Sequence, residues 1–189
     1  MIKPLLIFSL TLLSLTSFGQ FYKPVVPSAE FSVALEKIVR DFRHNYNNIT
    51  GEKIFSQAEV DSYESTVKLP GASNCYINRY HSVTDTSASW QAELYSGEDY
   101  KEAIKIYRNT FKLLNKSKMQ QVDRSIMTFT GYLEEPVETI RFATSTLTLD
   151  VSDRHYNNFV AEVELISSYS GFRVNVSLHA KTPESANGR

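Results

Sequence analysis

The sequence predicts an α+β domain in which two amphipathic helices pack against an antiparallel sheet of about six to seven strands. In two segments, apolar residues recur every three or four positions, which is the period of a helix with one buried face. In most of the remaining chain they alternate with polar residues, as in strands with one solvated face. Such strands joined by short turns are typical of antiparallel sheets, whose apolar side the helices must cover.

The first helical segment follows Ser28, a suitable N-cap residue, and Glu30, whose charge favours the positive end of a helix. We expect this helix to end near Asn48, because the Asn-rich residues 45–51 compete for backbone hydrogen bonds and adopt turn geometry. Its apolar face consists of Phe31, Ala34, Leu35, Ile38, Phe42 and Tyr46.

Three strands are expected next. Alternation begins at Ser62 and continues to a turn at residues 69–74, and residues 75–83 are extended again, so the two segments predict a hairpin. Residues 88–95 alternate as a third strand. Cys75 lies on the same side of its strand as Ile77, and we interpret it as a small core residue. As the single cysteine, it forms no disulfide within the chain.

The second helical segment is preceded by Ser96 and Asp99, which have the spacing of a capping box. Charged residues lie on its outer face. We interpret the apolar stripe as core rather than as the lining of a cofactor pocket, because aromatic stripes at helical spacing ordinarily pack inside. The stripe consists of Tyr100, Ala103, Ile104, Tyr107, Phe111 and Leu114.

Four more strands are expected at residues 125–133, 140–151, 159–165 and 172–178, of which the last two predict a hairpin. Both halves of the chain then consist of a helix followed by a meander, which suggests an αβββ internal duplication. Residues 90–94 (WQAEL) and 159–163 (FVAEV) each come after the first pair of expected strands in their half, and they share two identities. Generic strand composition explains so short a match equally well.

The first nineteen residues have the layout of a secretory signal peptide: Lys3, an apolar run from Leu5, and a small-residue exit before Gln20. The exit resembles those of Gram-negative exports, which implies a periplasmic or secreted protein. The apolar run is shorter than the roughly 20 residues that span a bilayer, and no cysteine follows it to carry a lipid, so we expect no stable membrane anchor after cleavage. An extended arm (20–27), a single α+β domain (28–181) and a flexible tail (182–189) follow.

Charge and motifs exclude several classes of function. The chain has 20 basic and 21 acidic residues and no clustered basic excess, which argues against nucleic-acid binding. The sequence contains no Gly-rich phosphate loop, nucleophile elbow or zinc-protease helix, and its four histidines lack metal-ligand spacing, so we expect no cofactor and no metal. The polar residues 150–155 are expected to make a turn rather than an acid–base site.

Aromatic residues are the one compositional excess, with 11 Tyr, 11 Phe and one Trp. Because tyrosine is amphipathic, such residues on strands and helix faces could line a binding surface. The candidate ligand-binding residues are Tyr63, Tyr76, Tyr80, Trp90, Tyr95 and Tyr132.

The resulting hypothesis is an exported, soluble bacterial domain that binds a protein partner or a small apolar ligand without catalysis. The alternative is a periplasmic or secreted hydrolase whose site is assembled only by the fold. An open sheet face with exposed tyrosines would favour binding, whereas a cleft in which His81, His155 or His179 meets a carboxylate would favour the enzyme. Oligomeric state and the identity of the ligand stay open.

Overall fold

The computed structural model describes residues 25–82, 86–120, 125–137 and 139–181. The expected signal peptide, most of the expected arm and the expected tail from residue 182 lie outside these residues. No helix in the described part is long and apolar enough to cross a membrane.

The described residues form two α-helices and one antiparallel sheet of nine strands, in agreement with the predicted α+β class. The helices are α1 (Ala29–Asp41) and α2 (Tyr100–Lys116), and short 3-10 turns are η1 (Phe42–His44), η2 (Asn47–Ile49) and η3 (Arg154–Tyr156). The strands are β1 (Thr50–Gln57), β2 (Val60–Ser65), β3 (Asn74–Tyr80), β4 (Ala88–Gly97), β5 (Lys118–Gln120), β6 (Ile126–Gly131), β7 (Ala143–Asp150), β8 (Phe159–Ser168) and β9 (Gly171–Ala180).

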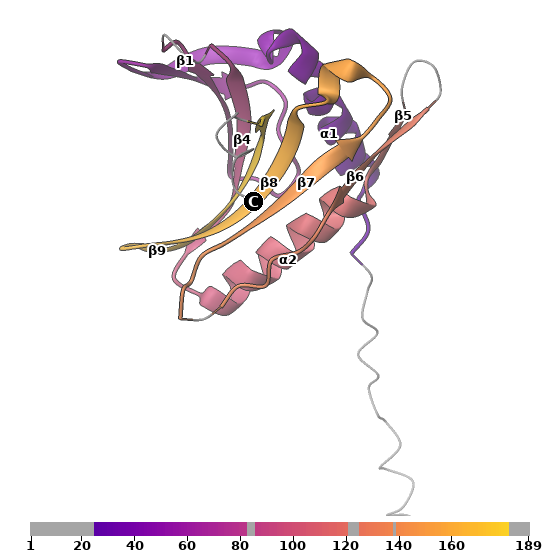
Figure 1. Cartoon of the computed structure of the whole chain (residues 1–189). Helices are drawn as coiled ribbons and strands as arrows, with labels where there is room; N and C mark the ends of the chain where they lie inside the picture. The colour runs from indigo at the N-terminus through magenta and orange to yellow at the C-terminus, as the bar shows by residue number, and fades with distance from the viewer. Residues whose placement is uncertain (1–24, 83–85, 121–124, 138, 182–189) are drawn as a thin grey trace, which may run out of the picture.

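The strand order is β1-β2-β3-β4-β9-β8-β7-β6-β5, so each half of the chain forms a meander that runs inward from one edge (Figure 1). The last strands of the two halves, β4 and β9, pair at the centre. The halves contain four and five strands, so the αβββ unit was wrong in its strand count. Residues 90–94 lie in the last strand of their half and residues 159–163 in the penultimate strand of theirs, so they do not occupy equivalent strands. The duplication itself stays a prediction.

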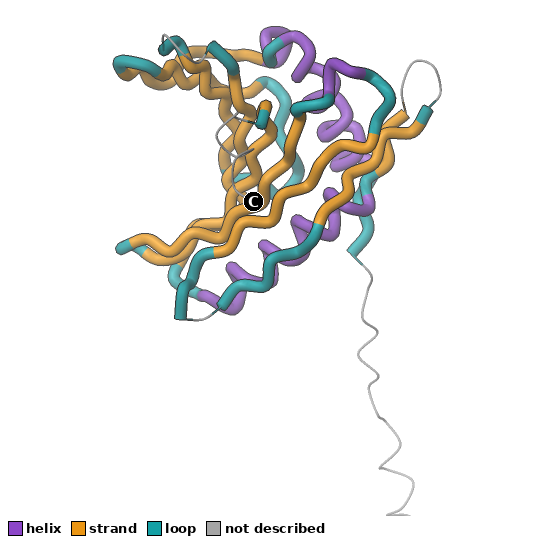
Figure 2. Tube along the Cα trace, in the orientation of Figure 1, coloured by secondary structure: helices purple, strands orange, loops and turns teal. Residues whose placement is uncertain are grey.

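The sheet is strongly bent, with both helices on its outer, convex side and an open concave side opposite (Figures 1 and 2). Helix α2 packs against β4, β6, β8 and β9, and α1 contacts the edge strand β5. One face of the sheet is therefore covered by helices and the other remains accessible.

The core lies between the helices and the covered face. Trp90 is fully buried there and is paired in register with Ile77 on one side and Leu178 on the other. Its indole Nε1 donates a hydrogen bond of 2.9 Å to Ser65 Oγ, and the Tyr46 hydroxyl donates one of 2.7 Å to the Leu178 carbonyl. Large aromatic side chains thus bury their rings while their polar atoms stay paired.

The predicted range of six to seven strands was wrong because β1 and β5 were not foreseen. The seven strands expected from alternation are all present, and β2–β3 and β8–β9 are antiparallel neighbours as predicted. Strand β2 is shorter than expected and ends at Ser65.

The two helix boundaries also differ from the prediction. Ser28 caps α1 as expected, since its side chain accepts from the Phe31 amide at 3.1 Å. The α-helix ends at Asp41, because Asn45 and Tyr46 adopt left-handed backbone conformations that an α-helix cannot contain. Ser96 belongs to β4, and Asp99 alone caps α2 by accepting from two backbone amides.

Candidate ligand-binding site

The open face of the sheet presents polar side chains in rows that run across the strands. In one row, Gln91 of β4 pairs with Ser177 of β9, and Ser177 pairs with Glu162 of β8. In the next, Glu93 pairs with Asn175 and Asn175 with Glu164. Directly opposed residues in antiparallel strands point to the same side, so each row forms a continuous polar band.

A groove with a volume of about 380 Å³ runs across this face over the adjacent strands β3, β4, β9 and β8. That volume lies within the range of small-molecule sites, which is about 300–1,000 Å³. The groove is lined by Tyr80, Ser87, Ser89, Gln91, Glu162, Glu164, Ser177, His179 and Ala180.

Side-chain size explains why the open face is hollowed at this point. Ser89 and Ser177 are short and only 4% and 6% exposed, so they form the floor. Longer side chains such as Tyr80, Gln91 and Glu162 stand around them and form the walls. Because successive residues of a strand alternate between faces, the covered-face neighbours of these serines, including Trp90 and Leu178, build the core directly beneath the groove.

The dominant interaction in the groove joins His179 and Glu162. Imidazole Nε2 lies 3.1 Å from Glu162 Oε2, and Nδ1 lies 2.8 Å from the Ala180 carbonyl oxygen. Both partners are acceptors, so both ring nitrogens donate and the favoured form is the imidazolium. The hydrogen bond with Glu162 raises the pKa of His179 and lowers the pKa of Glu162, against the opposing effect of burial.

Glu164 lies two residues along β8 from Glu162, on the same face. Its pKa is raised, first by burial and then by the neighbouring charge of Glu162. Within the described residues it forms no ion pair or hydrogen bond with another side chain. Two adjacent carboxylates therefore differ in environment, because one has a cationic partner and the other has none.

Ser89 supplies a second unpaired group. Its hydroxyl is buried on the groove floor and has no hydrogen-bond partner among the described residues. A buried hydroxyl without a partner is costly and uncommon in native structures. In a ligand-binding groove, such a group is available to a ligand.

The structure does not bring the six predicted aromatic residues together. Tyr80 lines the groove, and Tyr76, in register with Gln91, lies on the same open face in a neighbouring depression of about 340 Å³. Tyr63 and Trp90 are in register with the buried Ile77 and so lie on the covered face.

The other two predicted residues are also apart from the groove. A β-bulge after Glu93 places Tyr95 opposite the buried Val174, and its hydroxyl contacts the backbone of Asp99. Tyr132 follows β6 and is 93% exposed.

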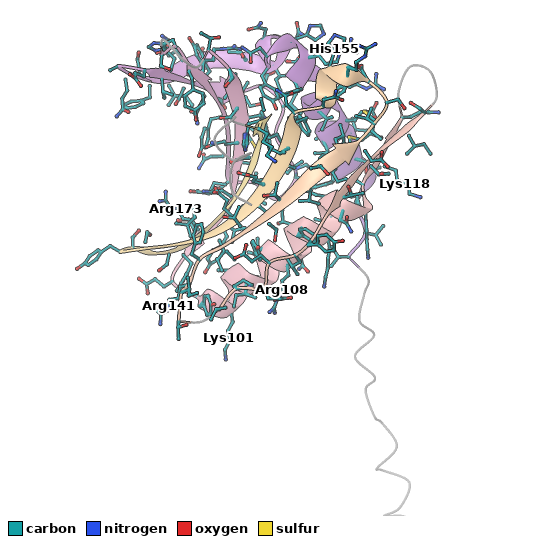
Figure 3. All side chains as sticks on the ribbon, viewed as in Figure 1. Lys101, Arg108, Lys118, Arg141, His155 and Arg173 are labelled. Carbon is teal, nitrogen blue, oxygen red and sulfur yellow. The ribbon has the colours of Figure 1, made fainter. Side chains whose placement is uncertain are left out.

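Of the three histidines considered for an enzyme, only His179 lines the groove. His155 Nδ1 lies 2.7 Å from Asp153 Oδ1 in the η3 loop. In Figure 3 this loop is well separated from Arg173, which lies on the open face of β9. In the η3 loop, Asp153 also accepts from the His155 amide, which confirms the predicted turn. His81 is 4.0 Å from Asp61 in an exposed position.

The groove residues other than Tyr80 and His179 were not candidates in the sequence. Their signal was present as polar positions that alternate with apolar ones, such as Glu162 and Glu164 between Ala161, Val163 and Leu165. No group of three or more His, Cys, Asp or Glu side chains in the described part of the chain could hold a metal ion.

Comparison with known proteins adds no assignment. The chain matches no family model, no curated protein and no solved structure.

Proposed function

We propose that this protein is an exported, non-catalytic binding domain that holds a small polar molecule in the groove on the open face of its sheet. The observation that carries the proposal is the buried, unpaired Ser89 hydroxyl on the groove floor. The unpaired carboxylate of Glu164 lies farther along the same groove, on β8, two strands away from Ser89. A preformed cavity with a few convergent polar groups is the usual form of a small-molecule site.

The lining favours a polar ligand over the apolar ligand expected from the aromatic content. Among the nine lining residues, seven carry hydroxyl, amide, carboxylate or imidazole groups besides the Tyr80 ring and Ala180. An apolar ligand would cover these groups without replacing their hydrogen bonds to water, which costs free energy. A partner protein stays a second hypothesis for the same open face.

The hydrolase is the second candidate, because His179 meets a carboxylate inside a groove that also contains serines. A general base needs a free ring nitrogen to accept a proton from the nucleophile. In His179 both nitrogens face acceptors, and neither is free for Ser89. This arrangement supports an ion pair that shapes a binding site better than it supports proton transfer.

Export is tested by fractionation and mass spectrometry of the full-length chain. We expect the recovered protein to lack residues 1–19 and to begin at Gln20. Recovery from the cytosol of a chain that still begins at Met1 would contradict this part of the proposal.

Binding is tested by calorimetry and thermal shift with a panel of polar small molecules, alongside turnover assays with ester, peptide and glycoside substrates. We expect one saturable site and no turnover, with affinity weakened at least tenfold by Gln91→Ala in the groove. The matched control is Gln57→Ala on the exposed edge strand β1, which leaves affinity unchanged. Substrate turnover that His179→Gln abolishes would instead establish the hydrolase.

A further inference from the structure

The positive and negative charges of the groove do not cancel. Three carboxylate or imidazole side chains line it, and two of them, Glu162 and His179, neutralise each other. The third, Glu164, is left with a negative charge when ionised and without a cationic partner among the lining residues. Burial of an unpaired carboxylate is unfavourable unless a positive charge is supplied.

The residues around the groove do not remove this imbalance. On the open face, Glu93 lies in the same row as Glu164, and Arg173 lies two residues along β9 from the intervening Asn175. These two side chains carry opposite charges and cancel to first order. Both influence Tyr76, whereas the charges that act on Glu164 are those of Glu162 and His179.

The neutral lining suits a cationic group that also carries hydroxyls. Tyr80 contributes an aromatic ring to the lining, and the Ser89 oxygen has unused acceptor positions. A metal cation is disfavoured, because the described residues contain no cluster of three or more metal-ligating side chains. An organic ammonium needs only one carboxylate together with hydroxyl and amide acceptors.

We propose that the ligand of this groove is a small hydroxylated primary amine, whose ammonium group pairs with Glu164 and whose hydroxyls bond the polar groups of the adjoining row, Gln91 and Ser177. This inference rests on the proposed function, since it names the chemical class of molecule that the binding groove accepts. The pairing removes the cost of the unpaired carboxylate.

The experiment measures calorimetric affinities for matched pairs at neutral pH: glucosamine against glucose and N-acetylglucosamine, and ethanolamine and serinol against ethylene glycol and glycerol. We expect at least one amine to bind at least tenfold more tightly than its neutral counterparts, with affinity falling as salt is raised. Glu164→Gln should reduce amine affinity at least tenfold, and the matched control Glu93→Gln should change it less than twofold.

Thermal unfolding of the Glu164→Gln variant shows whether the variant is folded. Because the pKa of Glu164 is raised in the folded state, its ionisation destabilises the fold above the ordinary carboxyl pKa. The variant should therefore melt at a higher temperature than the wild type at pH 7, and the difference should shrink below about pH 4.

The outcomes separate the two proposals. If glucose, glycerol or another neutral member binds as tightly as its amine, the groove is a binding site but the amine assignment is overturned. If no amine binds while a carboxylate such as gluconate does, the same conclusion follows. If no compound of either class binds, the proposed binding function fails together with the ligand assignment.

Discussion

At the scale of single residues, one buried hydroxyl serves three groups. Ser65 Oγ accepts from Trp90 Nε1 at 2.9 Å and from the Val67 amide at 3.2 Å, and it donates to the Val67 carbonyl at 2.8 Å. Removing it leaves the indole N–H without a partner in the core, because Trp90 is fully buried.

We predict that Ser65→Ala lowers the free energy of unfolding by about 1–3 kcal/mol, which is the cost of leaving a buried donor unpaired. Urea unfolding followed by Trp90 fluorescence measures the effect. The control is Ser167→Ala, which alters an exposed hydroxyl of β8 and should change stability by less than about 0.5 kcal/mol. Equal effects of the two substitutions would show that the Ser65 hydrogen bonds contribute nothing.

The His179–Glu162 pair predicts a pH dependence of stability. The raised pKa of His179 gives a contribution that is complete below its unfolded value, about 6.5, and is lost as pH rises through the folded pKa. The lowered pKa of Glu162 gives a contribution that is complete above about 4.5 and is lost as pH falls through the folded pKa. Both contributions are therefore present between about pH 4.5 and 6.5.

We predict that His179→Gln destabilises the protein most near pH 5.5 and progressively less toward pH 9. Denaturant unfolding of both proteins across this range measures the difference. His44→Gln is the control, because the His44 side chain forms no ion pair or hydrogen bond within the described residues. A pH-independent difference between wild type and His179→Gln would contradict the assigned imidazolium.

At the scale of elements, the start of α2 distinguishes a sequence motif from the structure it adopts. Ser96 and Asp99 have capping-box spacing, yet the Asp99 carboxylate accepts from the Lys101 amide at 2.8 Å and the Glu102 amide at 3.2 Å. Ser96 pairs with Arg173 across the sheet instead.

We predict that Asp99→Ala destabilises the protein by about 1 kcal/mol, as expected for loss of an N-cap. Ser96→Ala, the matched change at the other position of the motif, should cost less than half of that. Thermal unfolding monitored by circular dichroism compares the two. A larger loss of stability for Ser96→Ala than for Asp99→Ala would instead support the capping box predicted from the sequence.

Local sequence predicted the elements that have a buried face. Alternation in residues 159–165 and 172–178 reflects the buried positions of β8 and β9, such as Val163 and Val176. Strand β1 escaped prediction because most of its residues are exposed, so no apolar alternation marks it. Strand β5 has only three residues, which is too short for any period to show.

The site was only partly predictable, for a related reason. Alternation indicates that Glu162 and Glu164 share one face of β8, and that Ser177 and His179 share one face of β9. The groove also needs β4 beside β9, and these strands are joined by pairing between the two halves of the chain rather than by a turn. Sequence alternation contains no information about that distant neighbour, so Ser89 and Gln91 could not be placed in the site.

At the scale of the whole molecule, the sheet joins two meanders through the single β4–β9 contact at its centre. The central strands pair on both sides, whereas the outermost strands β1 and β5 pair on one side only. Opening at an edge breaks fewer hydrogen bonds and uncovers less core than separation at the centre.

We predict that backbone amides of β4 and β9 exchange with solvent slowest and those of β1 and β5 fastest, by at least two orders of magnitude. Hydrogen exchange measured by NMR or mass spectrometry provides the comparison. Uniform protection from β1 to β9 would contradict this gradient and indicate that the sheet opens only as one unit.

The buried cysteine of β3 gives experimental access to the same motions. Cys75 is 4% exposed, and burial raises the pKa of its thiol, so alkylating reagents react with it slowly while β3 stays in place. The rate at which iodoacetamide modifies Cys75 therefore reports how often the first meander (β1–β4) opens. The measurement needs no attached label. Comparing that rate with and without a bound small molecule would show whether occupancy of the concave face holds the two halves of the chain together.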